Sequence, residues 1–163
     1  MAFAPVTQER IEATLDQMGL KHYRSESDGV TVTAFPSAVC FFRLDGDMLN
    51  IVSRWLGKAH SEEEQDALRR AINHTNRSLP RLRAHRVDWE DGAMLAFIDA
   101  PFFPIGGLED EQLIGMLDFY FAMLRYATDQ LNELLPELSD ARDAAGADST
   151  EGNTGTANES QEA

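Results

Sequence analysis

Cysteine, basic residues and uninterrupted apolar runs are all scarce in this chain of 163 residues. A single cysteine, Cys40, excludes an internal disulfide, and its apolar neighbours predict a buried thiol in a reducing compartment. Lysine and arginine number 14 against 28 acidic residues, and the resulting net charge of −14 argues against nucleic acid or membrane lipid as a partner. The amino terminus lacks the basic and apolar regions of a signal peptide. We therefore expect a cytoplasmic protein.

The most apolar stretch, residues 113–131, reads LIGMLDFYFAMLRYATDQL. Asp118 and Arg125 interrupt it, whereas a membrane span needs about 20 largely uncharged residues. This stretch is therefore predicted to be a helix of the folded domain and not a membrane span.

Catalytic and ligand-binding motifs are missing as well. The four histidines share no zinc-ligand spacing with one another or with the cysteine; they are His22, His60, His74 and His85. The chain contains no glycine-rich phosphate loop, no G-x-S-x-G elbow and no calcium-loop ligand series. We therefore predict no enzyme, no metal site and no cofactor.

The composition changes at Pro136. Residues 137–163 contain no aromatic residue, one large apolar residue and seven acidic residues against one arginine. Such a segment cannot bury enough surface to offset its ordering entropy. The sequence thus predicts one domain over residues 1–136 and an acidic tail over residues 137–163. The tail is expected to be disordered from about residue 146, and residues 136–145 to form at most a short helical extension.

Local periodicity predicts an α+β fold. Helices are expected over residues 7–19, 62–77 and 109–135, with N-caps at Thr7 and Ser61. Strands with a period of two are expected over residues 21–27, 29–35, 38–44, 48–56, 81–90 and 93–100. The order α-ββββ-α-ββ-α favours an antiparallel sheet of about five or six strands with three helices packed on one face.

The last predicted helix carries two apolar seams. The first consists of Leu113, Leu117, Tyr120, Leu124, Ala127 and Leu131. The second, roughly 80° around the helix, consists of Met116, Phe119, Met123 and Tyr126. A helix that packs only on its own sheet needs an apolar stripe of about 100°. The second seam is therefore a candidate protein interface, for a homodimer or for another protein, unless the other helices bury it.

Two smaller features also suggest contacts. Positive charge is concentrated in the arginine segment Arg77, Arg81, Arg83 and Arg86. This segment is either a solvated face or a patch for an anionic partner, such as an acidic or phosphorylated peptide, because arginine binds carboxylates and phosphates with two hydrogen bonds. The sequence PFFP at residues 101–104 predicts a loop that is either a lid on the core or an exposed apolar contact.

Several stretches resemble proteins of the YbjN-domain family. They are VTQERIEATLDQMGLKHYRSESDGVTV, the strand ending in Arg54-Trp55-Leu56-Gly57, AINHTNRSLPRLRAHRV and GGLEDEQLIGMLDFYFAML. The resemblance covers residues 6–135 and implies a fold like that of type III secretion chaperones, often paired as dimers. The family is described as bacterial sensory-transduction regulators without an assigned activity, so it implies no catalytic residues.

Two functions from different classes follow. The first is a non-enzymatic protein-interaction module, a chaperone-like or regulatory adaptor acting through an apolar helix surface. The alternative is a small-molecule-binding or enzymatic domain with a pocket between helices and sheet. Its expected lining is Trp55, Trp89, Tyr120 and the arginines near residues 81–86.

Overall fold

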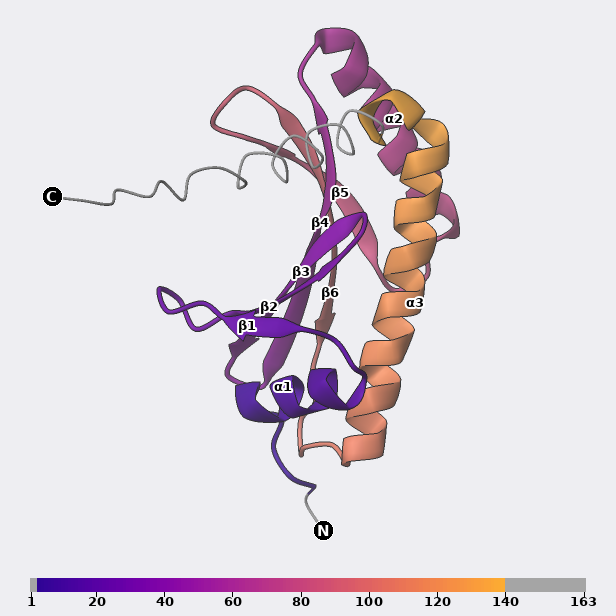
Figure 1. The fold of residues 1–163 in the computed structure, drawn as a ribbon. Coiled ribbons are helices and arrows are strands. Elements are labelled where there is room, and N and C mark those ends of the chain that lie inside the picture. The colour runs from indigo at the N-terminus through magenta and orange to yellow at the C-terminus, as the bar shows by residue number, and fades with distance from the viewer. Residues whose placement is uncertain (1–2, 140–163) are drawn as a thin grey trace, which may run out of the picture.

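The computed structural model describes residues 3–139, and residues 140–163 of the predicted acidic tail lie outside the described residues. The described part is an α+β fold in the predicted order α-ββββ-α-ββ-α, with one further short helical segment over residues 136–139 (Figure 1). The elements are α1 (Gln8–Gln17), β1 (His22–Arg24), β2 (Thr31–Phe35), β3 (Ala38–Asp45), β4 (Met48–Ala59), α2 (Glu62–Ser78), β5 (Arg83–Asp88), β6 (Met94–Phe102) and α3 (Asp110–Leu134).

The first two helices begin where their capping residues predict. The side-chain oxygen of Thr7 accepts the backbone N–H of Arg10 at 3.3 Å and starts α1. At α2, the Ser61 side chain accepts the N–H of Glu64, while the Glu64 carboxylate accepts the N–H of Ser61. Hydrogen bonds from the backbone N–H groups of Ser61 and His60 hold the pKa of Glu64 below its usual value. Both predicted N-caps are confirmed.

The six strands form one antiparallel sheet in the order β1-β2-β3-β4-β6-β5. Gly46 and Gly92 adopt positive φ angles of 58° and 81° in the turns that the Asp-Gly pairs predict. β1 is shorter than the predicted strand over residues 21–27, because the chain already turns back at Ser25, whose N–H binds the carbonyl of Val30 at 2.8 Å. Lys21 precedes β1, and residues 25–27 of that predicted strand belong to the turn.

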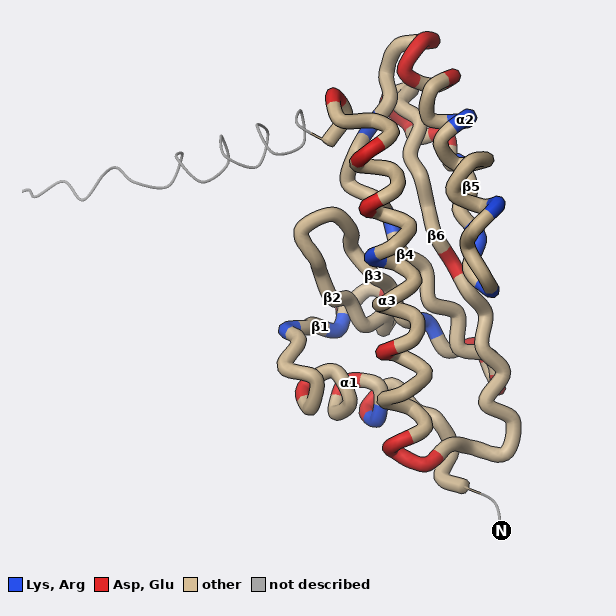
Figure 2. The backbone as a smooth tube through the Cα atoms, turned by 90° about the vertical axis from the view of Figure 1, so that its right-hand side faces the viewer, with Lys and Arg blue, Asp and Glu red and all other residues tan. Residues whose placement is uncertain are grey.

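All three long helices lie on one face of the sheet, and within residues 3–139 no helix lies on the other face (Figure 1 and Figure 2). Strand alternation explains the division. On β4, Leu49 and Ile51 are fully buried under the helices. The alternating residues Asn50 and Val52 point to the other face and are half-buried. The long strand β4 thus has a helix-covered side and a helix-free side.

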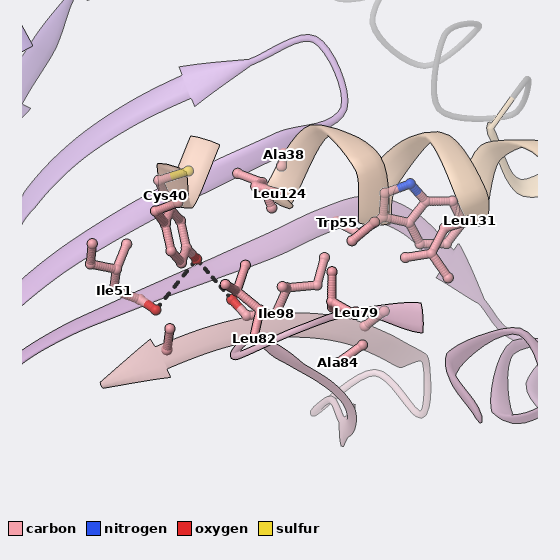
Figure 3. Close-up of a cluster of buried hydrophobic side chains, with 14 of the residues drawn as sticks. Ala38, Cys40, Ile51, Trp55, Leu79, Leu82, Ala84, Ile98, Leu124 and Leu131 are labelled. Atoms are coloured by element: carbon pink, nitrogen blue, oxygen red, sulfur yellow. Dashed lines mark hydrogen bonds between the residues drawn. The ribbon is translucent and has the colours of Figure 1, made fainter. Parts of the chain in front are cut away.

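The first seam of α3 forms the centre of the core. Each of its six residues is at most 3% exposed, so its prediction as a buried stripe is confirmed. Trp55 from β4 is also fully buried beside this helix, next to Leu131 (Figure 3). Its indole N–H donates to Asn132 Oδ1 at 2.9 Å. This hydrogen bond ties the centre of the sheet to the end of α3.

A small polar cluster lies inside this apolar core. The Tyr120 hydroxyl is 2.7 Å from Ser53 Oγ. It donates to the carbonyl of Ile98 at 3.1 Å and lies 3.4 Å from that of Ile51, the two carbonyls at which the dashed lines of Figure 3 end. Ser53 Oγ also lies 3.0 Å from Cys40 Sγ. Burial raises the pKa of the Cys40 thiol to about 12, so the group is protonated at neutral pH. The prediction of a buried cysteine is confirmed.

The segment at residues 101–104 differs from the predicted loop. β6 continues through Phe102, so Pro101 and Phe102 belong to the strand. Phe102 packs on the core with its ring centroid 6.4 Å from that of Tyr120, whereas Phe103 is 62% exposed. The ring of Phe102 therefore covers the core, whereas Phe103, just past the end of the strand, is exposed.

The packed part of the chain continues past Pro136. Leu135 and Leu138 are 8% and 7% exposed and contact the core cluster, and residues 136–139 are helical. The remainder of the helical extension predicted to residue 145 lies outside the described residues. Among the helices of residues 3–139, none has the length and apolar character needed to cross a membrane.

Candidate functional site

The second seam of α3 is only partly covered by the rest of the chain. Met116 and Met123 are half-buried and contact the core, while Phe119 and Tyr126 are 37% and 39% exposed. The Tyr126 hydroxyl lies 3.0 Å from Ser78 Oγ at the end of α2. The structure therefore brings the four residues together on one helix face and leaves two aromatic rings accessible.

The arginine segment is exposed but does not form one flat patch. Figure 2 shows lysine and arginine gathered along the end of α2 and along β5, at one edge of the molecule. In the strand register, Arg83 lies opposite Asp99 of β6 and Arg86 lies opposite Ala96. The two arginine side chains therefore leave β5 on opposite faces of the sheet. Within residues 3–139 none of these arginines forms an ion pair, although Arg83 donates to the carbonyl of Leu82 at 2.9 Å. This edge of the sheet is therefore basic, but its arginine side chains do not converge on one binding site.

The helix-free face of the sheet carries an apolar strip that crosses its central strands. Register places Phe41 of β3 between Val32 of β2 and Val52 of β4. In the adjacent row, β4 contributes Arg54 and β6 contributes Phe97. Val32 is buried, and the other four side chains are half-buried although no helix of the described residues lies over them. We call these five residues the helix-free strip.

Four residues of the helix-free strip line a hollow with a volume of about 890 Å³, namely Val32, Phe41, Val52 and Phe97, whereas Arg54 lies on the same face outside its lining. The other walls are Tyr23 of β1, the mostly polar turn that follows it, and Arg43 and Asn50. The turn between β1 and β2 and the turn between β5 and β6 both project on the side away from α3, so that they flank this face (Figure 1). The face is therefore concave and mainly apolar, which is the usual form of a binding surface.

Arg54 is the one charged residue of the helix-free strip. Its side chain is half-buried, and its Nε atom is buried without a hydrogen-bond partner in the described part of the chain. Its guanidinium also forms no ion pair with any residue in the range 3–139. Its two terminal guanidinium nitrogens are not buried in this way, so the charged end of Arg54 stays accessible and has no counter-charge within the described part of the chain.

Sequence analysis did not single out the helix-free strip. A signal was nevertheless present, because a sheet with one solvated face should alternate apolar and polar residues. In β3 and β4 the positions between the core residues are themselves apolar, as at Val39, Phe41 and Val52. Apolar residues on both sides of a strand were therefore the signal that could have singled out this face.

The alternative pocket between helices and sheet is not where the prediction placed it. Trp55 and Tyr120 are 0% exposed and fill the core, while Trp89 is 44% exposed at the turn between β5 and β6. Burial also raises the pKa of Tyr120. The hollow described above lies on the opposite face of the sheet from these two core rings. The predicted lining residues therefore do not surround a common cavity.

The histidines do not come together either. The His22 ring lies 3.0 Å from Asp16 Oδ1, and the His85 ring lies 3.9 Å from Asp99 Oδ2. In residues 3–139 no three histidine, cysteine, aspartate or glutamate side chains gather in a way that could hold a metal ion.

Comparison with known proteins shows a fold relationship. No protein-family profile and no curated protein sequence matches the chain. Among solved structures, the chain is similar to the crystal structure of YbjN from E. coli, a candidate transcription regulator. The similarity has a TM-score of 0.60 at 10% identity and covers 88% of this chain and 96% of that one. The chain therefore shares the YbjN-like α+β fold.

Proposed function

We propose that this chain is a non-enzymatic protein-interaction module, chaperone-like or regulatory, that binds a segment of another protein on the helix-free face of its sheet. The observation that carries the proposal is the helix-free strip, a concave apolar surface without a covering helix. An apolar side chain moved out of water contributes about 1.5–3 kcal/mol, so a strip of this size can contribute much of the affinity for a partner.

The fold relationship supports a regulatory function and gives no information on the partner. The resemblance of residues 6–135 to YbjN-domain proteins and the shared fold together favour kinship with that family. The structure related by fold is described as a candidate transcription regulator. We extend this regulatory function to the present chain as part of the proposal.

The second seam of α3 is proposed as the site of self-association. Its exposed rings, Phe119 and Tyr126, lie on the helix layer, on the opposite side of the sheet from the helix-free strip. A dimer formed through this seam would leave the concave face of each protomer open. The two surfaces can therefore act at the same time.

Site-specific photo-cross-linking tests the proposal. A benzophenone amino acid placed at Phe41 is expected to give discrete protein adducts in an extract of the native cells, while the same group at the exposed Asn73 of α2 gives none. Competition by excess unmodified protein should remove the adducts. If the group at position 41 gives no saturable protein adduct, the proposed function is wrong.

A small ligand is the second candidate, because a hollow of about 890 Å³ lies in the size range of ligand sites. A metabolite bound there would raise the thermal midpoint of unfolding by mass action. A saturable thermal shift that disappears in Val52→Glu would favour this candidate over a protein segment.

A further inference from the structure

We infer that the helix-free strip binds a protein segment in which an acidic residue is flanked by apolar residues, and that Arg54 binds its carboxylate. The inference rests on the proposed function, since it specifies the partner of the same surface. It follows from the position of Arg54, from its missing counter-charge and from the side chains around it.

The position of Arg54 is central. It lies on β4 directly between Val39 of β3 and Phe97 of β6, and one row away from the pair Phe41 and Val52. Its aliphatic stem therefore lies among apolar side chains, while its charged end belongs to a surface that a partner can reach. This placement differs from that of a solvated arginine at the rim.

The chain supplies no acid to Arg54 within residues 3–139, although acidic residues outnumber basic ones two to one in the whole sequence. By register the acid placed diagonally to Arg54 on the neighbouring strand is Asp99, but the Asp99 carboxylate lies 3.9 Å from the His85 ring. By contrast, Arg43 at the rim of the hollow reaches Asp28 at 3.5 Å. Arg54 thus retains a free guanidinium whose planar fork suits a carboxylate.

The surroundings of Arg54 exclude a partner that is only acidic. Phe41, Val52 and Phe97 stay in contact with water unless apolar atoms cover them. The acidic tail of this chain is a poor occupant for this reason, because residues 140–163 contain no large apolar side chain. A segment of another protein that combines an acid with aliphatic or aromatic neighbours matches both requirements.

Selection from a random library of 12-residue peptides displayed on phage, with the full chain immobilised, tests this inference. We expect enriched peptides to carry Asp or Glu among apolar residues. A synthetic peptide of the enriched sequence should bind Arg54→Met at least about tenfold more weakly, as expected for a lost charge-assisted pair. Its affinity for Arg70→Met should be unchanged, because Arg70 is exposed on α2 and equally unpaired. Circular dichroism melting confirms that each variant is folded.

A charge swap provides a second measurement. Arg54→Glu is expected to lose the acidic peptide and to regain binding when Lys replaces the acid of the peptide. Enriched peptides without an acid, or equal binding by Arg54→Met, would overturn the inference. The proposed function would still stand if Phe41→Glu abolished that binding. If the peptides bind Phe41→Glu as tightly as the parent and no adduct forms from position 41, both fail.

Two other occupants would also overturn the inference. One is the acidic tail, which would be recognised if a synthetic peptide of residues 140–163 displaced the library peptide. The other is a second copy of the chain, which would be recognised if Phe41→Glu converted a dimer into a monomer in light scattering.

Discussion

The side-chain amide of Asn76 binds both backbone groups of Ala84, and each N···O distance is 2.8 Å. Ala84 lies on β5, which is an edge strand of the sheet. At this position the outward N–H and C=O would otherwise lack a neighbouring strand. Asn76 thus substitutes for a strand and fastens α2 to the edge of the sheet.

Replacing Asn76 with alanine should lower the free energy of unfolding by about 1–3 kcal/mol, because it removes the partners of two backbone groups in a part-buried position. Urea denaturation followed by circular dichroism measures the loss. Asn73→Ala on the exposed side of the same helix is the control and should change stability by less than about 0.5 kcal/mol. Equal effects of the two substitutions would show that the pairing with Ala84 is unimportant.

Removing the Tyr120 hydroxyl should also be destabilising. Tyr120→Phe keeps the ring but leaves Ser53 and the carbonyl of Ile98 with fewer partners in the core, so a loss of about 1–2 kcal/mol is expected. Tyr126→Phe is the matched control, since that hydroxyl meets only the exposed Ser78. The comparison is made by thermal and urea unfolding. A loss confined to Tyr126→Phe would contradict the assignment.

Two glycines should respond to alanine in opposite directions. A Cβ atom at Gly57 would overlap the indole ring of Trp55, so Gly57→Ala is expected to destabilise by about 1–3 kcal/mol. Gly115 in α3 has open space around it, and Gly115→Ala should stabilise by about 1 kcal/mol through helix propensity. Urea midpoints of the two variants provide the test. A Gly57→Ala variant as stable as the parent would contradict the packing of Trp55 over Gly57.

Stability should fall at acid pH partly through Glu12. A hydrogen bond from Arg24 at 2.8 Å, together with one from Thr31, lowers the pKa of Glu12 below 4.5. Because the folded pKa is the lower one, the stabilisation is present above pH 4.5 and is lost as the pH falls through the folded pKa. The urea midpoint of Glu12→Gln should therefore fall less steeply than that of the parent as the pH is lowered from neutral. An equally steep fall in the variant would show that Glu12 does not contribute to the loss of stability at acid pH.

The second seam of α3 predicts self-association. Phe119→Glu combined with Met123→Glu should convert a dimer into a monomer while the circular dichroism spectrum is retained. Ala122→Glu, on an exposed part of the same helix, is the control and should leave the mass unchanged. Size-exclusion chromatography with light scattering over a range of concentrations gives the mass. A parent protein that is monomeric throughout would contradict this use of the seam.

Boundaries were predictable where a local signal ends an element and less so where a partner strand ends it. Thr7 and Ser61 are caps whose effect extends over three residues, so both helix starts were predicted from sequence. The end of β6 was not, because Phe102 remains in the strand by pairing with Leu49, about fifty residues earlier in the sequence. Periodicity reports neighbours along the chain and not partners across the sheet.

The sequence by itself determined the types and order of the elements, the buried seam of α3 and the buried thiol of Cys40. Each of these depends on periodicity or composition within a short window. The tertiary structure decided which residues share the helix-free face. Arg54 and Phe97 come together because β6 lies between β4 and β5, an order that no local pattern contains. Tertiary pairing also left Arg54 without a counter-charge, since no acid of residues 3–139 lies within ion-pair distance of it.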